Sequence, residues 1–221
     1  MWCIPVITQE YERKMMDVLE VYERPYDPKY PVVCVDEKSK QLLEKTRQDI
    51  PIKLGRIKRT DYEYKRNGTV NIFVAVEPKG KKRKVKVTTH RKAQDFAHFI
   101  EKLVNTTYRR AEKVILVTDN LNIHGEKSLK VTFGSEKAEE LLKRIEWHYT
   151  PKHASWLDQA EIEINALSRQ ALKQWIATFQ EMQKQCAAWQ KDRNKKQIGI
   201  NWQFTREKAQ EKFKLNKNYE R

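Results

Sequence analysis

Two short apolar runs, Val32-Val-Cys-Val-Asp36 and Val114-Ile-Leu-Val-Thr-Asp119, decide the fold class of this 221-residue chain. Both runs are rich in β-branched residues and bounded by polar sequence, which is typical of strands buried on both faces of a sheet. Each run gives way at once to an aspartate, so the first strand is expected to end at Asp36 and the later one at Asp119. If the two strands are neighbours, the aspartates lie side by side at the edge where ligands of α/β proteins gather.

The segments around these runs predict a mixed sheet covered by helices. Residues 69–76 and 84–88 flank a turn and predict an antiparallel hairpin, and residues 147–150 add a short extended piece. Apolar residues at helical spacing predict helices over 8–21, 93–104, 138–145 and 157–189. This order predicts an α/β protein with a mixed five-stranded sheet flanked by helices, a long C-terminal helix and a basic tail.

The composition is that of a folded protein that is attracted to polyanions. Hydrophobic residues make up 39% of the chain and the formal net charge is +15. This hydrophobic share is too high for a disordered chain, and the excess of basic residues favours nucleic acid as a partner. Solubility is the plainer explanation of the charge, and charge alone does not separate an enzyme from a passive binder.

Nothing in the sequence predicts a membrane segment or export. No run of about 18 apolar residues is present, and the N-terminus lacks the apolar core of a signal peptide. Cys3, Cys34 and Cys186 lie far apart, without the spacing of a zinc site, and fit reduced thiols. A cytoplasmic protein with no membrane partner is therefore expected.

The aspartates after the two strands are candidates for a metal site. Asp36 and Asp119 would repel each other and need a cation, and Mg²⁺ takes oxygen ligands of this kind. A third carboxylate from the helix over 157–189 would complete a two-metal site for phosphodiester chemistry. At 100° per residue, Glu161 falls at the edge of the apolar stripe, whereas Asp158 and Glu163 fall farther out and are expected on a solvated face. For either aspartate alone, the interpretation as a turn or helix-cap residue stays open.

Three segments resemble, in order, the catalytic blocks of DDE transposases. They are Val32-Val-Cys-Val-Asp36-Glu37-Lys-Ser-Lys-Gln-Leu, Val117-Thr-Asp119-Asn120-Leu-Asn-Ile-His124 and Tyr149-Thr-Pro-Lys-His-Ala-Ser-Trp-Leu-Asp-Gln-Ala-Glu161-Ile-Glu. The resemblance is to the bacterial insertion-sequence branch of the mariner-like superfamily, and it extends over nearly the whole chain. The spacing between Asp119 and Glu161 is also similar to that branch.

The resemblance implies a ribonuclease-H-like fold and a transposase of the bacterial cytoplasm. Such an enzyme cleaves DNA at transposon ends and then joins a 3′-hydroxyl to target DNA. The matching positions imply that Asp36, Asp119 and Glu161 are catalytic and hold two Mg²⁺ ions, for which Mn²⁺ would substitute. The expected organisation is an N-terminal helix and linker over 1–30, the catalytic domain over 31–190 and the basic tail over 191–221.

The same resemblance suggests further residues and partners. Asn120 and His124 belong to the second block, and Lys38 stands where the family usually has threonine; all three are candidates for positioning DNA or metal-bound water. Full-length relatives carry N-terminal helix-turn-helix modules, so a separate helix-turn-helix half is an expected partner. Double-stranded DNA and a second copy of the chain, as a homodimer on DNA, are the others.

Two other functions stay open beside the transposase. An inactive or partner-dependent transposase fragment would act only as a DNA-binding protein, and a general ribonuclease-H-like nuclease would cut without regard to transposon ends. The substitutions Asp36→Asn, Asp119→Asn and Glu161→Gln would each abolish metal-dependent cleavage in an enzyme. In a passive binder they would leave the DNA affinity almost unaltered.

Basic and aromatic residues outside the three blocks are candidates for DNA contact. Lys81, Lys82, Arg83 and Lys84 cluster at the predicted hairpin, where they would contact phosphates or form a solvated hairpin tip. Trp156, beside the third block, would stack on a base or pack at the helix start. The basic tail would track DNA or be solvated.

Overall fold

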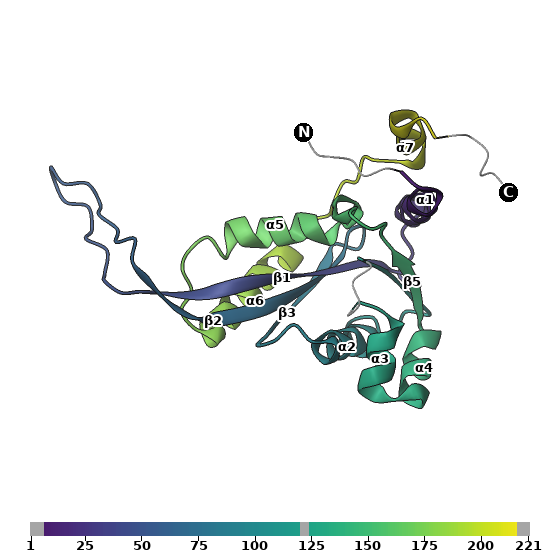
Figure 1. Cartoon of the computed structure of the whole chain (residues 1–221), viewed down its shortest axis with the longest axis horizontal. Coiled ribbons are helices and arrows are strands. Elements are labelled where there is room, and N and C mark those ends of the chain that lie inside the picture. The colour runs from purple at the N-terminus through teal and green to yellow at the C-terminus, as the bar shows by residue number, and fades with distance from the viewer. Residues whose placement is uncertain (1–6, 120–123, 216–221) are drawn as a thin grey trace.

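A computed structural model describes residues 7–119 and 124–215, which form three layers with a five-stranded sheet between two groups of helices (Figure 1). The strands are β1 (Val32–Lys45), β2 (Tyr64–Glu77), β3 (Lys82–Thr88), β4 (Val114–Thr118) and β5 (Ile145–Tyr149). The helices are α1 (Gln9–Glu23), α2 (Ala93–Lys102), α3 (Glu126–Phe133), α4 (Ser135–Lys143), α5 (Ala160–Gln170), α6 (Phe179–Lys195) and α7 (Arg206–Phe213). A π-helical turn follows α2 (Leu103–Thr107), and a 3-10 turn precedes α5 (Ser155–Leu157).

The sheet is mixed, with the strand order β3-β2-β1-β4-β5. β1, β2 and β3 pair antiparallel, whereas β4 is parallel to β1 and β5 is parallel to β4. The predicted hairpin is confirmed, and the two central strands, β1 and β4, are neighbours. An antiparallel meander followed by parallel crossovers brings the carboxyl ends of β1 and β4 to the same region.

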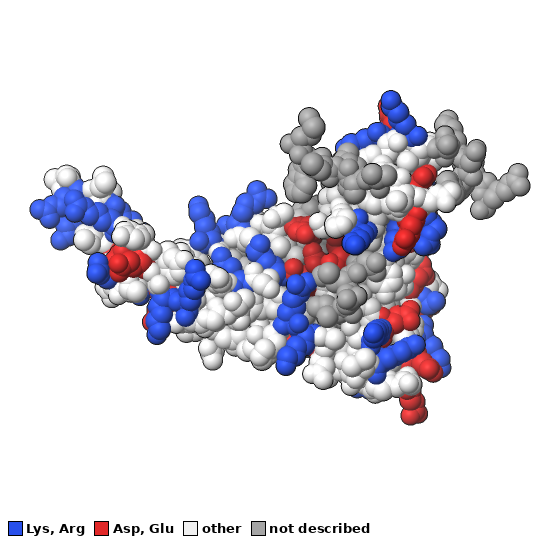
Figure 2. All heavy atoms as spheres, in the orientation of Figure 1, with Lys and Arg blue, Asp and Glu red and all other residues white. Residues whose placement is uncertain are grey.

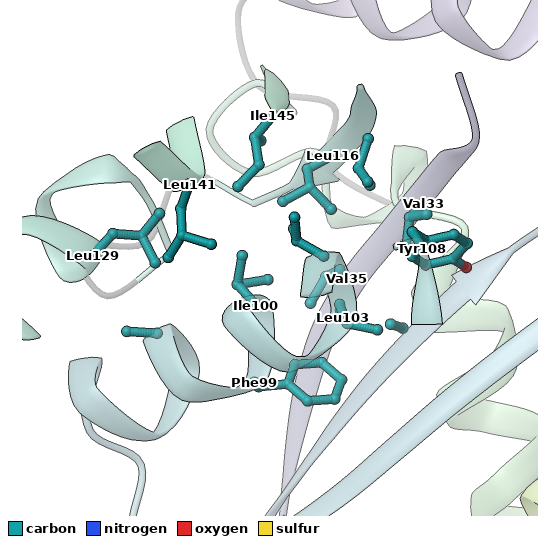
Figure 3. Packing of buried hydrophobic residues seen from close by; sticks show 14 of the residues in the cluster. Val33, Val35, Phe99, Ile100, Leu103, Tyr108, Leu116, Leu129, Leu141 and Ile145 are labelled. Carbon is teal, nitrogen blue, oxygen red and sulfur yellow. The ribbon is translucent and has the colours of Figure 1, made fainter. Parts of the chain in front are cut away.

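One face of the sheet packs on α2, α3 and α4. Val35 of β1 and Leu116 of β4 point toward Ile100 of α2, and all three side chains are fully buried (Figure 3). Phe73 of β2 stacks on Phe99 with 5.6 Å between ring centroids. Each fully buried apolar side chain of this size stabilises the fold by about 1.5–3 kcal/mol.

The opposite face packs on α1, α5, α6 and α7. Cys34 and Val117 meet α1 and the start of α5, and Ile72 of β2 meets Leu167 of α5 and Met182 of α6. Side chains alternate along a strand, so Asp36, two residues after Cys34, also projects toward this face. The side of the sheet that carries α5 is therefore the side on which the candidate carboxylates converge.

The single helix predicted over 157–189 is wrong, because the chain forms α5 and α6 with a turn between them. Leu172 and Ile176 of the intervening segment are buried, which is why the apolar spacing continues through it. The side-chain oxygen of Thr178 accepts a hydrogen bond from the backbone of Glu181 at 3.2 Å and caps α6. The pair of Thr and, three residues later, Glu is a helix-start signal, and it marks this break in the sequence.

The first strand does not end at Asp36, as the sequence predicted, but continues to Lys45. β1 and β2 pair beyond the body of the sheet and carry a long hairpin, residues 43–66, which we call the arm (Figure 1). Four side chains of the arm, Ile52, Leu54, Ile57 and Tyr62, are 75–105% exposed. Polar sequence between strand runs concealed this extension, because the arm has no core to bury.

The C-terminal segment returns to the body instead of remaining solvated. Trp202 and Phe204 pack against the cluster around α1, and Tyr22 of α1 meets the Trp202 ring edge-on at 5.4 Å. Cys34 and Cys186 are buried free thiols, and Cys3 lies outside the described residues. None of the described helices is long and apolar enough to cross a membrane.

Candidate active site

Two aspartates occupy matching positions in adjacent parallel strands. Val35 and Thr118 form the last pair between β1 and β4, and Asp36 and Asp119 are the next residues along the chain. Asp36 projects to the side of the sheet that carries α5, and Asp119 directly follows the last residue of β4. Asp36 is only 8% exposed, so its carboxylate lies in a largely desolvated position.

A third carboxylate comes from the first turn of α5. Glu161 is half-buried there, and its charge acts on Asp36, as does that of Asp119. The three residues predicted as a triad are thus brought to one place by β1, β4 and α5. The N-terminus of a helix also carries a partial positive charge, which favours carboxylates at this position.

Asp158 joins this group, which the sequence did not predict. The side chain was expected on a solvated face, yet it is 1% exposed. Its Oδ1 accepts a hydrogen bond from the backbone of Ala160 at 2.8 Å, and its Oδ2 is buried without a hydrogen-bond partner among the described residues. The prediction failed because α5 begins only at Ala160, so helical angles do not apply to Asp158.

The electrostatics of the site are those of carboxylates crowded in a desolvated space. Burial, followed by the charges of Glu37, Asp119 and Glu161, raises the pKa of Asp36 to about 7. Burial, then the charge of Asp36, raises the pKa of Asp158 well above its usual range. Without a cation, the group can reduce this repulsion only by taking up protons.

His124 forms a second layer behind Asp119. The ring is 1% exposed and packs on Phe96 with 4.7 Å between centroids. Its Nδ1 contacts the carboxylate of Asp119 and its Nε2 contacts that of Glu37. Although burial alone would lower the pKa of His124, these two contacts outweigh it and raise the pKa to about 9.

Glu37 is the member of this layer that the sequence did not reveal. It follows Asp36 in β1 and therefore projects from the opposite face, toward His124 and α2. Its other oxygen pairs with Arg91. Asp36, Glu37 and His124 each offer a ligand atom, and these atoms lie within 4.8 Å of one another. Because both ring nitrogens of His124 already contact carboxylates, the carboxylates are the better candidate ligands.

The donor set of the site fits a hard divalent cation. Four carboxylates act on one another through their charges, those of Asp36, Asp119, Glu161 and Asp158. Among the described residues, Asp158 Oδ2 is a buried acceptor that lacks a donor. Mg²⁺ and Mn²⁺ favour such oxygen ligands. Figure 2 shows acidic side chains gathered over one end of α5, with Lys and Arg side chains toward the arm.

The predicted basic cluster at the hairpin is only partly a surface feature. Arg83 is 2% exposed and bound to Glu163, so its prediction as a DNA-contacting residue is wrong. Glu163, expected on a solvated face, is likewise buried. Lys81 is exposed, Lys84 is half-buried, and Lys82 lies 3.7 Å from a Glu77 oxygen.

That hairpin turn also lies away from the carboxylates. Val76, next to the turn, pairs with Cys34, on the amino-terminal side of Asp36 in β1. Lys38 lies on the other side of Asp36 and is half-buried. Trp156 is 42% exposed, two residues before Asp158, with its ring 5.4 Å from that of Phe204. Asn120 lies outside the described residues.

A mixed five-stranded sheet between helical layers, with one carboxylate directly after β4 and another in β1 where its pairing with β4 stops, is a ribonuclease-H-like fold. The family model of the DDE superfamily endonucleases matches residues 31–183, more than half of the chain. The chain therefore belongs to the DDE superfamily endonucleases, and it has the fold of a DDE transposase catalytic region. No curated protein matches it significantly.

Solved structures of the Mos1 transposase share this fold. The Mos1 paired-end complex with left transposon end is similar over 90% of this chain and 61% of that chain, with 16% identity and a TM-score of 0.55. The Mos1 mariner paired end complex with Mn has a TM-score of 0.54 at the same identity and coverage. The Mos1 Strand Transfer Complex is similar over 92% of this chain and 66% of that chain, with 16% identity and a TM-score of 0.53. The chain thus spans less than two thirds of the length of these relatives.

Proposed function

We propose that this chain is the catalytic domain of a bacterial insertion-sequence transposase, which cleaves DNA strands at transposon ends and joins them to target DNA in the cytoplasm. The observation that carries the proposal is the convergence of Asp36, Asp119 and Glu161 from β1, β4 and α5. A domain of the DDE endonuclease family with this arrangement is suited to phosphodiester chemistry.

The proposed cofactor is Mg²⁺, two ions in the active state, with Mn²⁺ as a substitute. Asp36, Asp119 and Glu161 would hold the metal. Asp158 lies close enough for its carboxylate to feel their charges, so it could contribute a ligand as well. The bound metal would supply charge stabilisation at the phosphate and activate an attacking oxygen. The chain's own residues bind and orient: His124 holds Asp119, and Glu37 holds His124.

Double-stranded DNA is the proposed substrate, at transposon ends and in the target. The net charge of +15 and the Lys and Arg side chains on the face around the acidic group supply phosphate contacts (Figure 2). The candidates for such contacts remain Lys38, Lys81, Lys82, Lys84, Trp156 and Asn120. The Mos1 structures with this fold include a paired-end complex with left transposon end and a Strand Transfer Complex, which agrees with this substrate.

A homodimer on DNA and a separate helix-turn-helix half are the proposed protein partners. Their support is the exposed apolar surface of the arm, since exposed large apolar groups mark interaction sites. Measuring the mass of the protein–DNA complex, with and without a truncated arm, tests the dimer. A complex that contains one copy of the chain at saturating DNA contradicts it.

The test of the catalytic proposal is nicking of supercoiled plasmid DNA in Mn²⁺. The parent chain should nick the plasmid, and Asp119→Asn and Glu161→Gln should not, although all three should unfold at similar temperatures. Glu139→Gln, an exposed change on α4, is the matched control and should nick like the parent. Equal nicking by the parent and Asp119→Asn would contradict the assignment of Asp36, Asp119 and Glu161 as catalytic residues.

The alternative is a fragment that binds DNA but acts only with a partner, or not at all. This alternative predicts that neither the parent nor the variants nick the plasmid, and that all of them bind DNA with an affinity that falls as salt rises. Adding a helix-turn-helix half together with transposon-end DNA then separates a partner-dependent enzyme from an inactive one. A general nuclease would instead nick DNA with and without transposon ends equally.

A further inference from the structure

Three buried charged side chains join α5 to β3 and α6. Glu163 accepts hydrogen bonds from Arg83 Nε at 3.1 Å, from Arg83 Nη2 at 2.9 Å and from Arg193 Nη2 at 2.7 Å. The side chains of Arg83 and Glu163 are 0% exposed, and that of Arg193 is 12% exposed. The two-pronged contact from Arg83 constrains direction as well as distance.

The partners of Glu163 are themselves held in place. The side chain of Asn194 in α6 accepts from the backbone N–H of Arg83 at 2.8 Å and donates to its carbonyl at 3.0 Å. Arg83 is thus fixed to α6 through its backbone and to α5 through its guanidinium. Burial alone would raise the pKa of Glu163, but the hydrogen bonds from Arg83 and Arg193 outweigh it and lower the pKa, so the carboxylate stays charged.

This group lies on the side of α5 away from the candidate metal site. Glu161 precedes Glu163 by two residues, and at 100° per residue their side chains leave the helix in nearly opposite directions. The charge of Glu161 acts on Asp36, while Glu163 faces β3 and α6. Any rotation of α5 about its axis would therefore displace both carboxylates together.

Apolar packing alone positions a helix of this length loosely. Ile164 and Leu167 of α5 rest on the sheet, but apolar contacts are non-directional. A rotation of about 20° moves a carboxylate about 6 Å from the helix axis by about 2 Å. Catalytic groups have to be held within about 0.5 Å, so a directional contact is required in addition.

We propose that Arg83, Glu163 and Arg193 form a clamp that sets the rotation of α5 and thereby positions Glu161 beside Asp36 and Asp119. The proposal rests on the proposed function, in which Glu161 is a metal ligand. Buried ion groups often add little net stability compared with apolar side chains of similar volume. Positional specificity is what this clamp supplies, and Glu163 is a positioning residue that touches no substrate.

The test compares Arg83→Lys, Glu163→Gln and Arg193→Lys with the parent and with Gln170→Ala. Arg83→Lys keeps the positive charge but cannot make the two-pronged contact of the guanidinium with Glu163. Arg193→Lys alters the most exposed member of the group and carries the least risk to folding. Gln170→Ala removes the hydrogen bond from Trp189 Nε1 at 2.8 Å, which joins the same two helices at the far end of α5. Backbone amide spectra of the metal-free full chain report the position of residues 158–161. Electron paramagnetic resonance of free Mn²⁺ reports metal affinity.

We expect Arg83→Lys and Glu163→Gln to shift the amide resonances of residues 158–161 and to weaken Mn²⁺ binding about tenfold. Arg193→Lys should do the same more weakly, and Gln170→Ala should leave both measurements unchanged. Folded clamp variants with unchanged amide resonances at 158–161 and Mn²⁺ affinity within twofold of the parent would overturn the proposal. If the parent itself binds no Mn²⁺, the proposed function fails, and the metal-free amide spectra still decide whether the clamp positions α5.

Discussion

The two halves of β1 differ in what lies beside them. From Val32 to Val35 the strand pairs with β4 on one side, and from Cys34 onward it pairs with β2 on the other. After Asp36, β4 has ended, and β1 pairs with β2 alone until it leads into the arm. The first half is largely buried and leads to Asp36 at the point where β4 ends, whereas the arm presents side chains such as Leu54 to solvent.

This difference shows that the candidate metal site lies where one strand stops and its neighbour continues. The end of β4 opens space beside Asp36, and the start of α5 fills it with Glu161 and Asp158. The base of the arm contacts the segment between α5 and α6, through Tyr64 on Trp175 and Leu43 on Ile176, whereas exposed side chains farther out, such as Leu54, are available to meet another molecule. Substitutions in the two halves should therefore have very different consequences.

The largest difference should appear in catalysis. Asp36→Asn should lower Mn²⁺-dependent nicking by about 10²–10³-fold, the scale at which a lost charge-stabilising group affects a reaction. Leu54→Ser at the arm tip should leave the folding of the protein intact. It should reduce nicking only at low protein concentration, where assembly of the protein on DNA limits the rate. Plasmid nicking at high and low protein concentration measures both effects. A folded Asp36→Asn variant that nicks at the parental rate would contradict the role of this strand half.

The next difference should appear in the cost of breaking an ion pair. Arg83→Met leaves Glu163 buried with one partner fewer and should destabilise the fold by about 3–5 kcal/mol. Arg47→Met removes a contact of the arm with Asp61 at 3.3 Å, where the Arg47 side chain is 73% exposed, and should cause no measurable change. Urea unfolding of both variants makes the comparison. Equal stability of the two would show that the buried group is not a structural anchor.

A smaller effect should follow from the raised pKa of Asp36. Because its folded-state pKa of about 7 exceeds the unfolded value, its favourable contribution is complete below about pH 4 and is lost as the pH rises through 7. Metal-free Asp36→Asn should therefore be more stable than the parent at pH 8 by about 1–4 kcal/mol, at about 1.4 kcal/mol per pKa unit. The difference should shrink toward pH 4, and Mg²⁺ should stabilise the parent alone.

Unfolding in chelator across this pH range, repeated with Mg²⁺, checks the prediction. Glu139→Gln on α4 serves again as the control and should follow the parent at every pH. An Asp36→Asn variant that is less stable than the parent at pH 8 would show that the carboxylate group is not strained by repulsion.

The smallest effect on stability should come from the arm itself. Leu54 is fully exposed, so Leu54→Ser removes no buried surface and should change the free energy of unfolding by less than about 0.5 kcal/mol. The same change should raise solubility if the arm tip drives association. Urea unfolding and light scattering at increasing concentration measure the two quantities. A large loss of stability would mean that the arm packs on another part of the chain.

Much of this arrangement was predictable from the sequence, because it depends on local patterns. The apolar runs around Cys34 and Leu116 predicted two central strands, and the sheet confirms them as parallel neighbours. The hairpin of β2 and β3, α1 and α2 were also predicted near their observed positions. The family is confirmed, whereas the roles of Asp36, Asp119 and Glu161 remain predictions that the geometry supports.

Other features could not be predicted because they depend on which elements meet. Asp158, Glu163 and Arg83 are charged residues, and hydropathy alone assigns such residues to the surface. Only the packing of β3 and α6 against α5 shows that Arg83 neutralises Glu163 and that both are buried. Only the late start of α5, at Ala160, turns Asp158 inward.

The sequence by itself determined most of the strand and helix segments and the family, since backbone preference and apolar spacing are properties of neighbouring residues. The tertiary structure alone decided which charges are buried, where β1 leaves the sheet to form the arm, and which side of α5 faces the carboxylates. The physical reason is that desolvation and ion pairing depend on surroundings supplied by distant parts of the chain, and no local pattern records them.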